Sequence, residues 1–136
     1  MLMKGQYYLC GIAMALAQSA DDAAIPIRFR PDVLAAMAVD HQVPKYPLGA
    51  LKARKGGVAI ATIQIDQAGR VASVDVTASP GDDFKLAVNS ALLRWTFSPA
   101  KLHGVVHPAV GRIVTYFQCN VDGCEVTIPG ITDRTK

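Results

Sequence analysis

The sequence is poor in charge, and this shortage excludes some classes of protein. Only 18% of its 136 residues are charged and the formal net charge is +3, whereas a nucleic-acid-binding domain carries a concentrated basic stripe. The densest basic cluster, Lys52 with Arg54 and Lys55, fits the solvated end of a short helix better than a nucleic-acid site. The hydrophobic content of 51% is too high for a disordered chain. We therefore expect one domain with a substantial core and no nucleic-acid partner.

Residues for catalysis and metal binding are also scarce. His103 and His107 are four residues apart, and His41 stands alone. On a helix, His103 and His107 would share one face and could bind a metal, but Gly104 and Pro108 argue against a helix there. The chain has no Gly-x-Ser-x-Gly motif, and no phosphate-binding loop with a Lys-Ser or Lys-Thr pair. The sequence thus predicts no enzyme activity, no catalytic residue, no metal and no cofactor.

The first twenty residues have the three-part form of a secretory signal peptide. A positive start at Lys4 precedes an apolar run over residues 7–17, and small residues follow near position 20. The run is shorter than the roughly 20 residues of a spanning helix, so an uncleaved anchor is the alternative. Cys10 does not indicate a lipoprotein, because the residues before it are large. We expect export after cleavage of residues 1–20.

The other two cysteines predict a structural disulfide. Cys119 and Cys124 bracket the turn-forming stretch Asn120-Val121-Asp122-Gly123, which lies between two β-prone stretches. In an oxidising compartment such a pair can face across a hairpin and form a disulfide. A zinc site would need a second pair of ligands at suitable spacing. The short loop implies a stabilisation of about 2 kcal/mol in the chain-entropy model, and the disulfide would hold the end of a strand.

The local patterns predict an α+β fold. Asp66 to Gly69 form a turn in which Gly69 takes a positive φ. Apolar residues at three- and four-residue steps from Phe84 to Trp95 predict one buried helical stripe, with Trp95 and Phe97 in the core. The predicted elements are helices over 48–53 and from Ser79-Pro80 to before Pro99, and strands over 58–65, 71–77 and 110–119. We therefore predict a three-stranded antiparallel sheet packed with two helices, preceded by a signal peptide.

The predicted domain organisation has four parts. Pro26 and Pro31 interrupt the segment after the signal peptide, where residues 32–39 could form a short helix. Gly104 and Pro108 bracket a loop before the last strand. The parts are a signal peptide over 1–20, an irregular segment over 21–43, a domain over 44–128 and a tail over 129–136.

An ordered set of short motifs runs through roughly residues 44–118. The motifs are Pro44-x-Tyr46-Pro47, Gly57, Asp66-x-x-Gly69-Arg70-Val71, Phe84-x-x-Ala87-Val88-x-x-Ala91-Leu92-x-x-Trp95-x-Phe97-x-Pro99-Ala100 and an alternating last strand. Each motif alone is ordinary turn or core chemistry, but in their order and spacing the set resembles the C-terminal domain family of TonB energy transducers.

The resemblance implies a protein-binding module of the periplasm. In the family, an extended segment of an outer-membrane receptor adds as a strand beside the last strand, with side chains at alternate positions tuning specificity. Two alternatives stay open, namely that Tyr46 is a packing residue and that Arg112 is a charge that protects an open edge from aggregation. The pattern leaves open which alternate set faces the core. The implied partner-binding residues are Tyr46, Pro47, Val110, Arg112, Val114 and Tyr116, with Gly111, Ile113 and Phe117 on the other face.

Two departures from the family weaken the case for energy transduction. The N-terminal apolar run carries no histidine, and no long proline-rich linker follows it, although energy-coupling members have both. We therefore expect a periplasmic module that binds receptors or other envelope proteins. One alternative is a transducer anchored in the inner membrane by residues 5–20, in the transport of siderophores or other nutrients. Another is a self-associating structural module, a homodimer whose last strand pairs with its copy.

Overall fold

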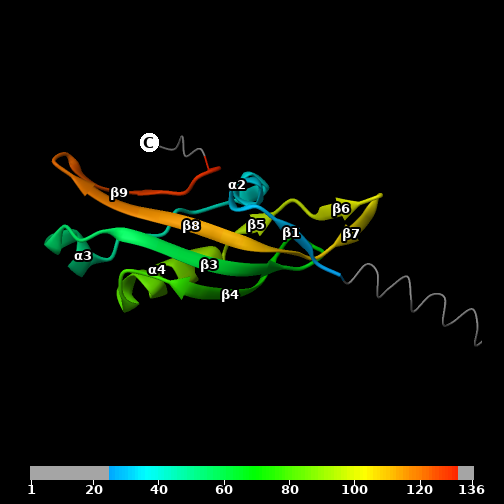
Figure 1. The fold of residues 1–136 in the computed structure, drawn as a ribbon, viewed down its shortest axis with the longest axis horizontal. Coiled ribbons are helices and arrows are strands. Elements are labelled where there is room, and N and C mark those ends of the chain that lie inside the picture. Colours follow the sequence, from blue (N-terminus) through cyan, green and yellow to red (C-terminus); the bar gives the residue numbers. More distant parts are fainter. Residues whose placement is uncertain (1–24, 132–136) are drawn as a thin grey trace, which may run out of the picture.

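The computed structural model describes residues 25–131, which form a long, narrow molecule built on one extended sheet (Figure 1). The predicted signal peptide lies outside the described residues. The elements are β1 (Ile27–Phe29), α2 (Pro31–Ala36), β2 (Ala38–Asp40), α3 (Leu48–Ala53), β3 (Gly57–Ile65), β4 (Val71–Ala78), α4 (Asp82–Leu92), β5 (Thr96–Phe97), β6 (Ala100–Leu102), β7 (Val105–His107), β8 (Ala109–Asn120) and β9 (Gly123–Thr127).

The main sheet has five strands in the order β1-β8-β3-β4, with β9 also paired to β8. The three predicted strands are β4, β3 and β8, which are neighbours in this order in the sheet. The α+β class is confirmed, but the predicted count of strands is wrong because short segments at both ends of the described chain pair with β8. Two small sheets, β2–β5 and β6–β7, complete the described part, which has three helices instead of the predicted two.

Alternation along β3 and β8 fixes the two faces of the sheet. The two strands pair antiparallel over nine residues, from Gly57 opposite Phe117 to Ile65 opposite Ala109. Ile63 and Ile113 are fully buried, and their face lies under α4. Because side chains alternate along a strand, the even-numbered residues of β8 lie on the opposite face, which we call the outer face.

The helix α4 supplies most of the buried stripe that the spacing predicts, with Phe84, Val88 and Leu92 each at most 1% exposed, but it ends at Leu92, so Trp95 follows the helix instead of lying on it. Its predicted start is wrong by about two residues, because the N-cap is Gly81 and the helix begins at Asp82. The Ser79 hydroxyl instead bonds to the Gly81 carbonyl at 3.0 Å. Ser79 lies two residues before the N-cap, and no side chain caps α4.

The core also contains Trp95 and Phe97, as predicted, at 1% and 3% exposure. The Trp95 indole N–H donates to the Gln42 carbonyl at 2.8 Å, so this buried polar group has a partner. The turn before β4 contains Gly69 at φ 89°, which confirms the predicted hairpin.

Residues 25–40 are ordered elements, although the sequence predicted an irregular segment there. The short helix predicted over 32–39 stops at Ala36, and the next residues form β2. Tertiary contacts decide this, because Ala38 pairs with Phe97 of β5 and the Ser98 N–H donates to the Met37 carbonyl at 3.0 Å. The sequence shows no local signal for such a distant partner.

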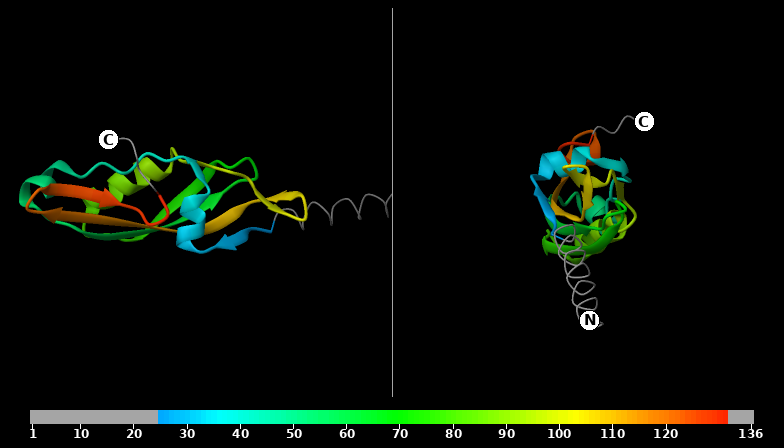
Figure 2. Two further views of the ribbon diagram at one scale, coloured as in Figure 1. Left: turned by 90° about the horizontal axis from the view of Figure 1, so that it is seen from above. Right: turned by 90° about the vertical axis from the view of Figure 1, so that its right-hand side faces the viewer.

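The segment from Ala100 to His107 forms a hairpin of β6 and β7, where the sequence predicted a loop. The chain turns at His103 and Gly104, both with positive φ, 53° and 80°. Figure 2 shows this hairpin at one end of the molecule and α3 with the β8–β9 turn at the other. Among residues 25–131, no helix has the length and apolar character needed to cross a membrane.

Candidate partner-binding edge

The strand β8 has two sides of different construction. One side pairs with β3 along nine residues. The other side, which we call the outer edge, is occupied by β1 at Ala109–Gly111 and by β9 at Tyr116–Asn120. Figure 1 shows β9, α2 and β1 in a row along this edge. The sequence predicted an edge open to a partner, and the structure corrects this because the chain's own segments lie there.

The helix α2 fills the interval between the two added strands. A Cβ placed on Gly111 of β8 would come within 2.8 Å of the Leu34 side chain and 2.9 Å of the Phe29 carbonyl oxygen. A Cβ on Gly130 would lie 2.6 Å from the Asp32 carbonyl oxygen. Leu34 is fully buried. The two glycines therefore permit α2 to approach β8 on one side and the C-terminal segment on the other.

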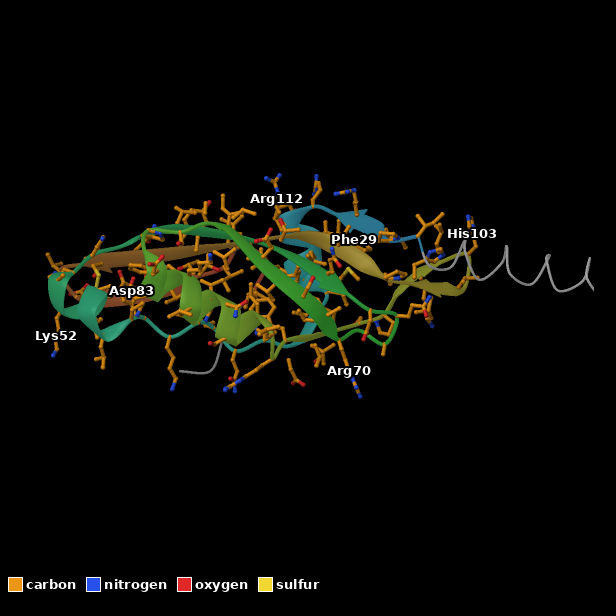
Figure 3. All side chains as sticks on the ribbon, turned by 90° about the horizontal axis from the view of Figure 1, so that it is seen from below. Phe29, Lys52, Arg70, Asp83, His103 and Arg112 are labelled. Carbon is orange, nitrogen blue, oxygen red and sulfur yellow. A yellow bond between two sulfur atoms is a disulfide. The ribbon has the colours of Figure 1, made fainter. Side chains whose placement is uncertain are left out.

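The four predicted binding residues of β8 lie together on the outer face. Arg112 is exposed, Val114 and Tyr116 are half-buried and Val110 is 9% exposed. Figure 3 shows Arg112 pointing away from the body of the molecule. Tyr116 is opposite Val58, and Val114 is opposite Ile60 of β3. These four side chains form a strip along the outer face, in which the basic Arg112 lies between the apolar Val110 and Val114.

A basic residue that the sequence reasoning missed lies next to this strip. Arg28 of β1 is opposite Val110, so it is on the same face as Arg112 and beside it. Both arginines line a surface cleft of about 480 Å³ together with Arg30, which forms an exposed 3.2 Å ion pair with Asp32. No sequence pattern indicated Arg28 as a site residue, because only the parallel pairing of β1 brings it beside β8. The arrangement suits carboxylate groups, which arginine binds through paired hydrogen bonds.

Tyr46 lies at the other end of β8. Its ring makes edge contacts with Phe84 and Phe117, at centroid distances of 5.9 and 5.4 Å. Its hydroxyl donates to the Lys55 carbonyl at 2.5 Å and lies 3.1 Å from the Cys119 sulfur. Burial raises the pKa of Tyr46, and the positive charge of Arg54 partly opposes this effect. Tyr46 therefore packs against the core and holds the chain after α3 against β8.

The six predicted residues do not form one cluster. Pro47 is the N-cap of α3, so Tyr46 and Pro47 lie near the β9 end of β8. Val110 and Arg112 lie near the β1 end. With a rise of about 3.3 Å per residue, the nine steps from Val110 to Cys119 span roughly 30 Å. A bound segment would have to run along most of β8 to contact both groups.

The disulfide joins Cys119 to Cys124, as predicted, with an S–S distance of 2.00 Å. The two residues are directly opposite each other in the register of β8 and β9. The Arg54 side chain also donates to the Asn120 carbonyl beside them. The disulfide therefore ties β9 to β8 at the end farthest from β1.

The two histidines that the sequence spacing brought together have separate surroundings. His107 is 8% exposed, and its Nδ1 lies 3.1 Å from the Ile25 carbonyl oxygen. His103 is at the exposed tip of the β6–β7 hairpin (Figure 3). Within residues 25–131, no three His, Cys, Asp or Glu side chains come together as a metal site. His107 instead contacts the segment that leads into β1.

One buried polar group of β8 has no partner among the described residues. The Thr115 hydroxyl is fully buried and accepts or donates no hydrogen bond there. Thr115 stands on the core face, in the interval between the residues that pair with β1 and those that pair with β9. A buried hydroxyl without a partner costs free energy.

Comparison with known proteins identifies the family to which this chain belongs. The family described as the Gram-negative bacterial TonB protein C-terminal matches residues 42–118. The solution structure of the Pseudomonas aeruginosa TonB C-terminal domain is similar in fold, with a TM-score of 0.53 and 23% sequence identity over 61% of this chain and 85% of that chain. A search of curated proteins finds no match. The chain therefore belongs to the TonB C-terminal domain family, whose members are protein-interaction modules of the cell envelope.

Proposed function

We propose that this chain is a periplasmic module that binds extended segments of outer-membrane receptors or other envelope proteins by strand addition at the outer edge of β8. The observation that carries the proposal is β1. This segment lies about 80 residues before β8 in the chain, yet it pairs with Ala109–Gly111 as a parallel strand. The edge therefore accepts an added strand that no hairpin turn brings to it.

The residues around β1 indicate the chemistry that a partner would meet. Ile27 and Phe29 project toward the core side and pack against it half-buried, while Arg28 lies on the outer face beside Arg112. A partner strand would thus place alternate side chains over an apolar surface and beside a basic one. Backbone hydrogen bonds would supply affinity, and carboxylate side chains on the outer face would add selectivity through the arginines.

Tyr46 has a supporting role in this proposal. Its ring and hydroxyl contact Phe117 and Cys119 at the far end of β8, so it attaches that end of the strand to the segment before α3. Pro47 starts α3 directly after it. A partner segment long enough to reach this end would run past both residues.

Photo-crosslinking tests where a receptor segment binds. The probes are synthetic peptides with the sequences of the periplasm-facing N-terminal segments of outer-membrane receptors from the same organism. Two variants of the full chain carry p-benzoylphenylalanine, one at Arg112 of β8 and one at Asp75 of β4, an exposed residue of the opposite edge strand that is separated from Arg112 by Thr62 of β3. We expect crosslinking from position 112 at least tenfold above position 75.

Two outcomes would contradict the proposal. Binding of no receptor peptide, and capture of no envelope protein by the full chain, would remove the receptor as partner. Equal crosslinking from both positions, or crosslinking from position 75 alone, would move the binding site to the β4 edge.

Fractionation and intact mass of the protein in a Gram-negative host test its cellular location. We expect a processed periplasmic species, and an unprocessed membrane-bound species would support the anchored transducer.

A further inference from the structure

The segments that cover the outer edge of β8 come from outside the family match. The match runs from residue 42 to residue 118 and includes β3 and most of β8. The elements β1 and α2 precede it, and β9 follows it. We call these three elements, β1, α2 and β9, the cover. The cover therefore lies outside the part of the chain that matches the family. It occupies the edge at which strand addition is proposed.

The two parts of the cover are attached with different strength. Five residue pairs and the Cys119–Cys124 disulfide hold β9 to β8. Only three pairs hold β1. The Ile27 N–H donates to the Pro108 carbonyl at 2.9 Å, and His107 contacts the Ile25 carbonyl at 3.1 Å. Since β9 is tied covalently, β1 is the part that can leave.

The segment with β1 and α2 also has a fixed end. After α2, the chain is held by the pairing of Ala38 with Phe97 and by the bond from the Ser98 N–H to the Met37 carbonyl. Residues 25–36 can therefore separate from β8 about a hinge at Met37 without disturbing β2. Their release would uncover the interval of β8 that contains Thr115, whose buried hydroxyl has no partner among residues 25–131.

We infer that residues 25–36 are an exchangeable resident ligand of the β8 edge, which a partner segment replaces when it binds. This inference rests on the proposed function and names the partner's chemistry. The partner runs parallel to β8, as β1 does, and carries apolar side chains that replace Ile27, Phe29 and Leu34. Because the site is open only in a fraction of the molecules, the resident segment lowers the apparent affinity for any partner by that fraction.

Two variants of the full chain test the exchange from opposite directions. Ile27→Pro removes the N–H that donates to Pro108, so it opens the edge. Arg28→Cys with Val110→Cys places two cysteines on register partners at a strand spacing that a disulfide can bridge, so it locks β1 in place. Val121→Pro is the matched control, because Val121 lies in the β8–β9 turn outside the segment and is 97% exposed.

The probe is a fluorescein-labelled peptide with the sequence of residues 25–36, and its binding is measured by fluorescence anisotropy. We expect Ile27→Pro to bind it at least tenfold more tightly than the unmodified chain and Val121→Pro. We expect the locked variant to bind it at least tenfold more weakly, and reductant to restore binding. The unmodified chain in the same reductant controls for loss of the Cys119–Cys124 disulfide, and a scrambled peptide controls for sequence.

The outcomes separate this inference from the proposed function. Equal peptide binding by the locked, opened and unmodified chains, or binding by none of them, would overturn the resident-ligand inference. If receptor peptides crosslink to β8 equally well in the locked variant, strand addition stands and exchange fails. If the 25–36 peptide exchanges as expected while no receptor peptide binds, exchange stands and the receptor assignment fails.

Discussion

The two sides of β8 show two ways of completing a strand. On one side, β3 pairs with it continuously over nine residues, and both strands belong to the family-matched part of the chain. On the other side, β1, α2 and β9 each occupy a short interval, and all three come from residues outside that part. The first side is built as core, and the second is assembled from separately attached segments.

This difference teaches where the molecule can change without unfolding. Local opening in proteins follows regions that bury few apolar groups and are held by few bonds. The β3 side is held by fully buried residues such as Ile63 and Ile113. On the other side, Ile27 and Phe29 are half-buried, and the buried side chains are Leu34 and Ala35 of the short helix α2. The following variants test this contrast, from the largest expected effect to the smallest.

Truncation of a buried side chain should separate the two sides most clearly. We expect Ile63→Ala on β3 to lower the free energy of unfolding by about 2–5 kcal/mol, as buried Ile-to-Ala changes do. Leu34→Ala on α2 removes a side chain of similar size but should cost less in global stability, because the cover can open before the rest unfolds. Denaturant unfolding measures both, and an equal or larger loss for Leu34→Ala would contradict the contrast.

Removal of the disulfide should leave β9 attached to β8 by strand pairing alone, as β1 is. We expect the double variant Cys119→Ser, Cys124→Ser to lose about 2 kcal/mol, because the six-residue loop is no longer closed in the unfolded chain. Chemical denaturation of the oxidised protein and of the double variant gives the difference. Reduced unmodified protein should match the variant. An unchanged midpoint would show that pairing alone holds β9.

Replacement of Thr115 should stabilise the protein. We expect Thr115→Val to raise the free energy of unfolding by about 1 kcal/mol, because it removes a buried hydroxyl without a partner and keeps the shape of the side chain. Thr62→Val, at a half-buried position of the outer face, is the control and should change stability by less than about 0.5 kcal/mol. A loss of stability in Thr115→Val would show that the hydroxyl makes a bond in the folded protein.

Alkaline pH should have the smallest effect on folding stability, through the titration of Tyr46 near the β9 end of β8. Burial raises the pKa of Tyr46 above its ordinary value, which is about 10. The folded state then holds the phenol proton more tightly than the unfolded state, so this stability is present below about pH 10 and is lost as pH rises through the folded pKa. Urea midpoints between pH 8 and 11 should show the loss in the unmodified chain and in Tyr116→Phe. Tyr46→Phe should lack it.

The sequence predicted the elements that follow local rules. The stripe from Phe84 to Leu92, the turn with Gly69 and the cysteine pair each depend on residues close together in the chain, and all three are present in the structure. The start of α4 was misplaced because the Ser79 hydroxyl bonds to Gly81 instead of capping.

The cover could not be predicted in the same way. Ile27–Phe29 is a strand only because Ala109–Gly111 offers it an edge, and no nearby residue signals that pairing. The β2–β5 pairing is equally distant in sequence. As a result, the predicted binding residues of β8 were placed on an edge assumed to be open, and Arg28 was left out of the site.

Native-state hydrogen exchange tests the unequal attachment of the two sides most directly. The amide of Ile27, which donates to Pro108, and that of Leu34, which donates to the Arg30 carbonyl, report on the cover. The amides of Ile63 and Ile113 report on the core strands. We predict that the cover amides exchange through a local opening, with lower protection and little dependence on denaturant, while the core amides exchange only by global unfolding. Equal protection and equal denaturant dependence at all four amides would contradict the account, because the cover would then leave β8 only when the whole domain unfolds.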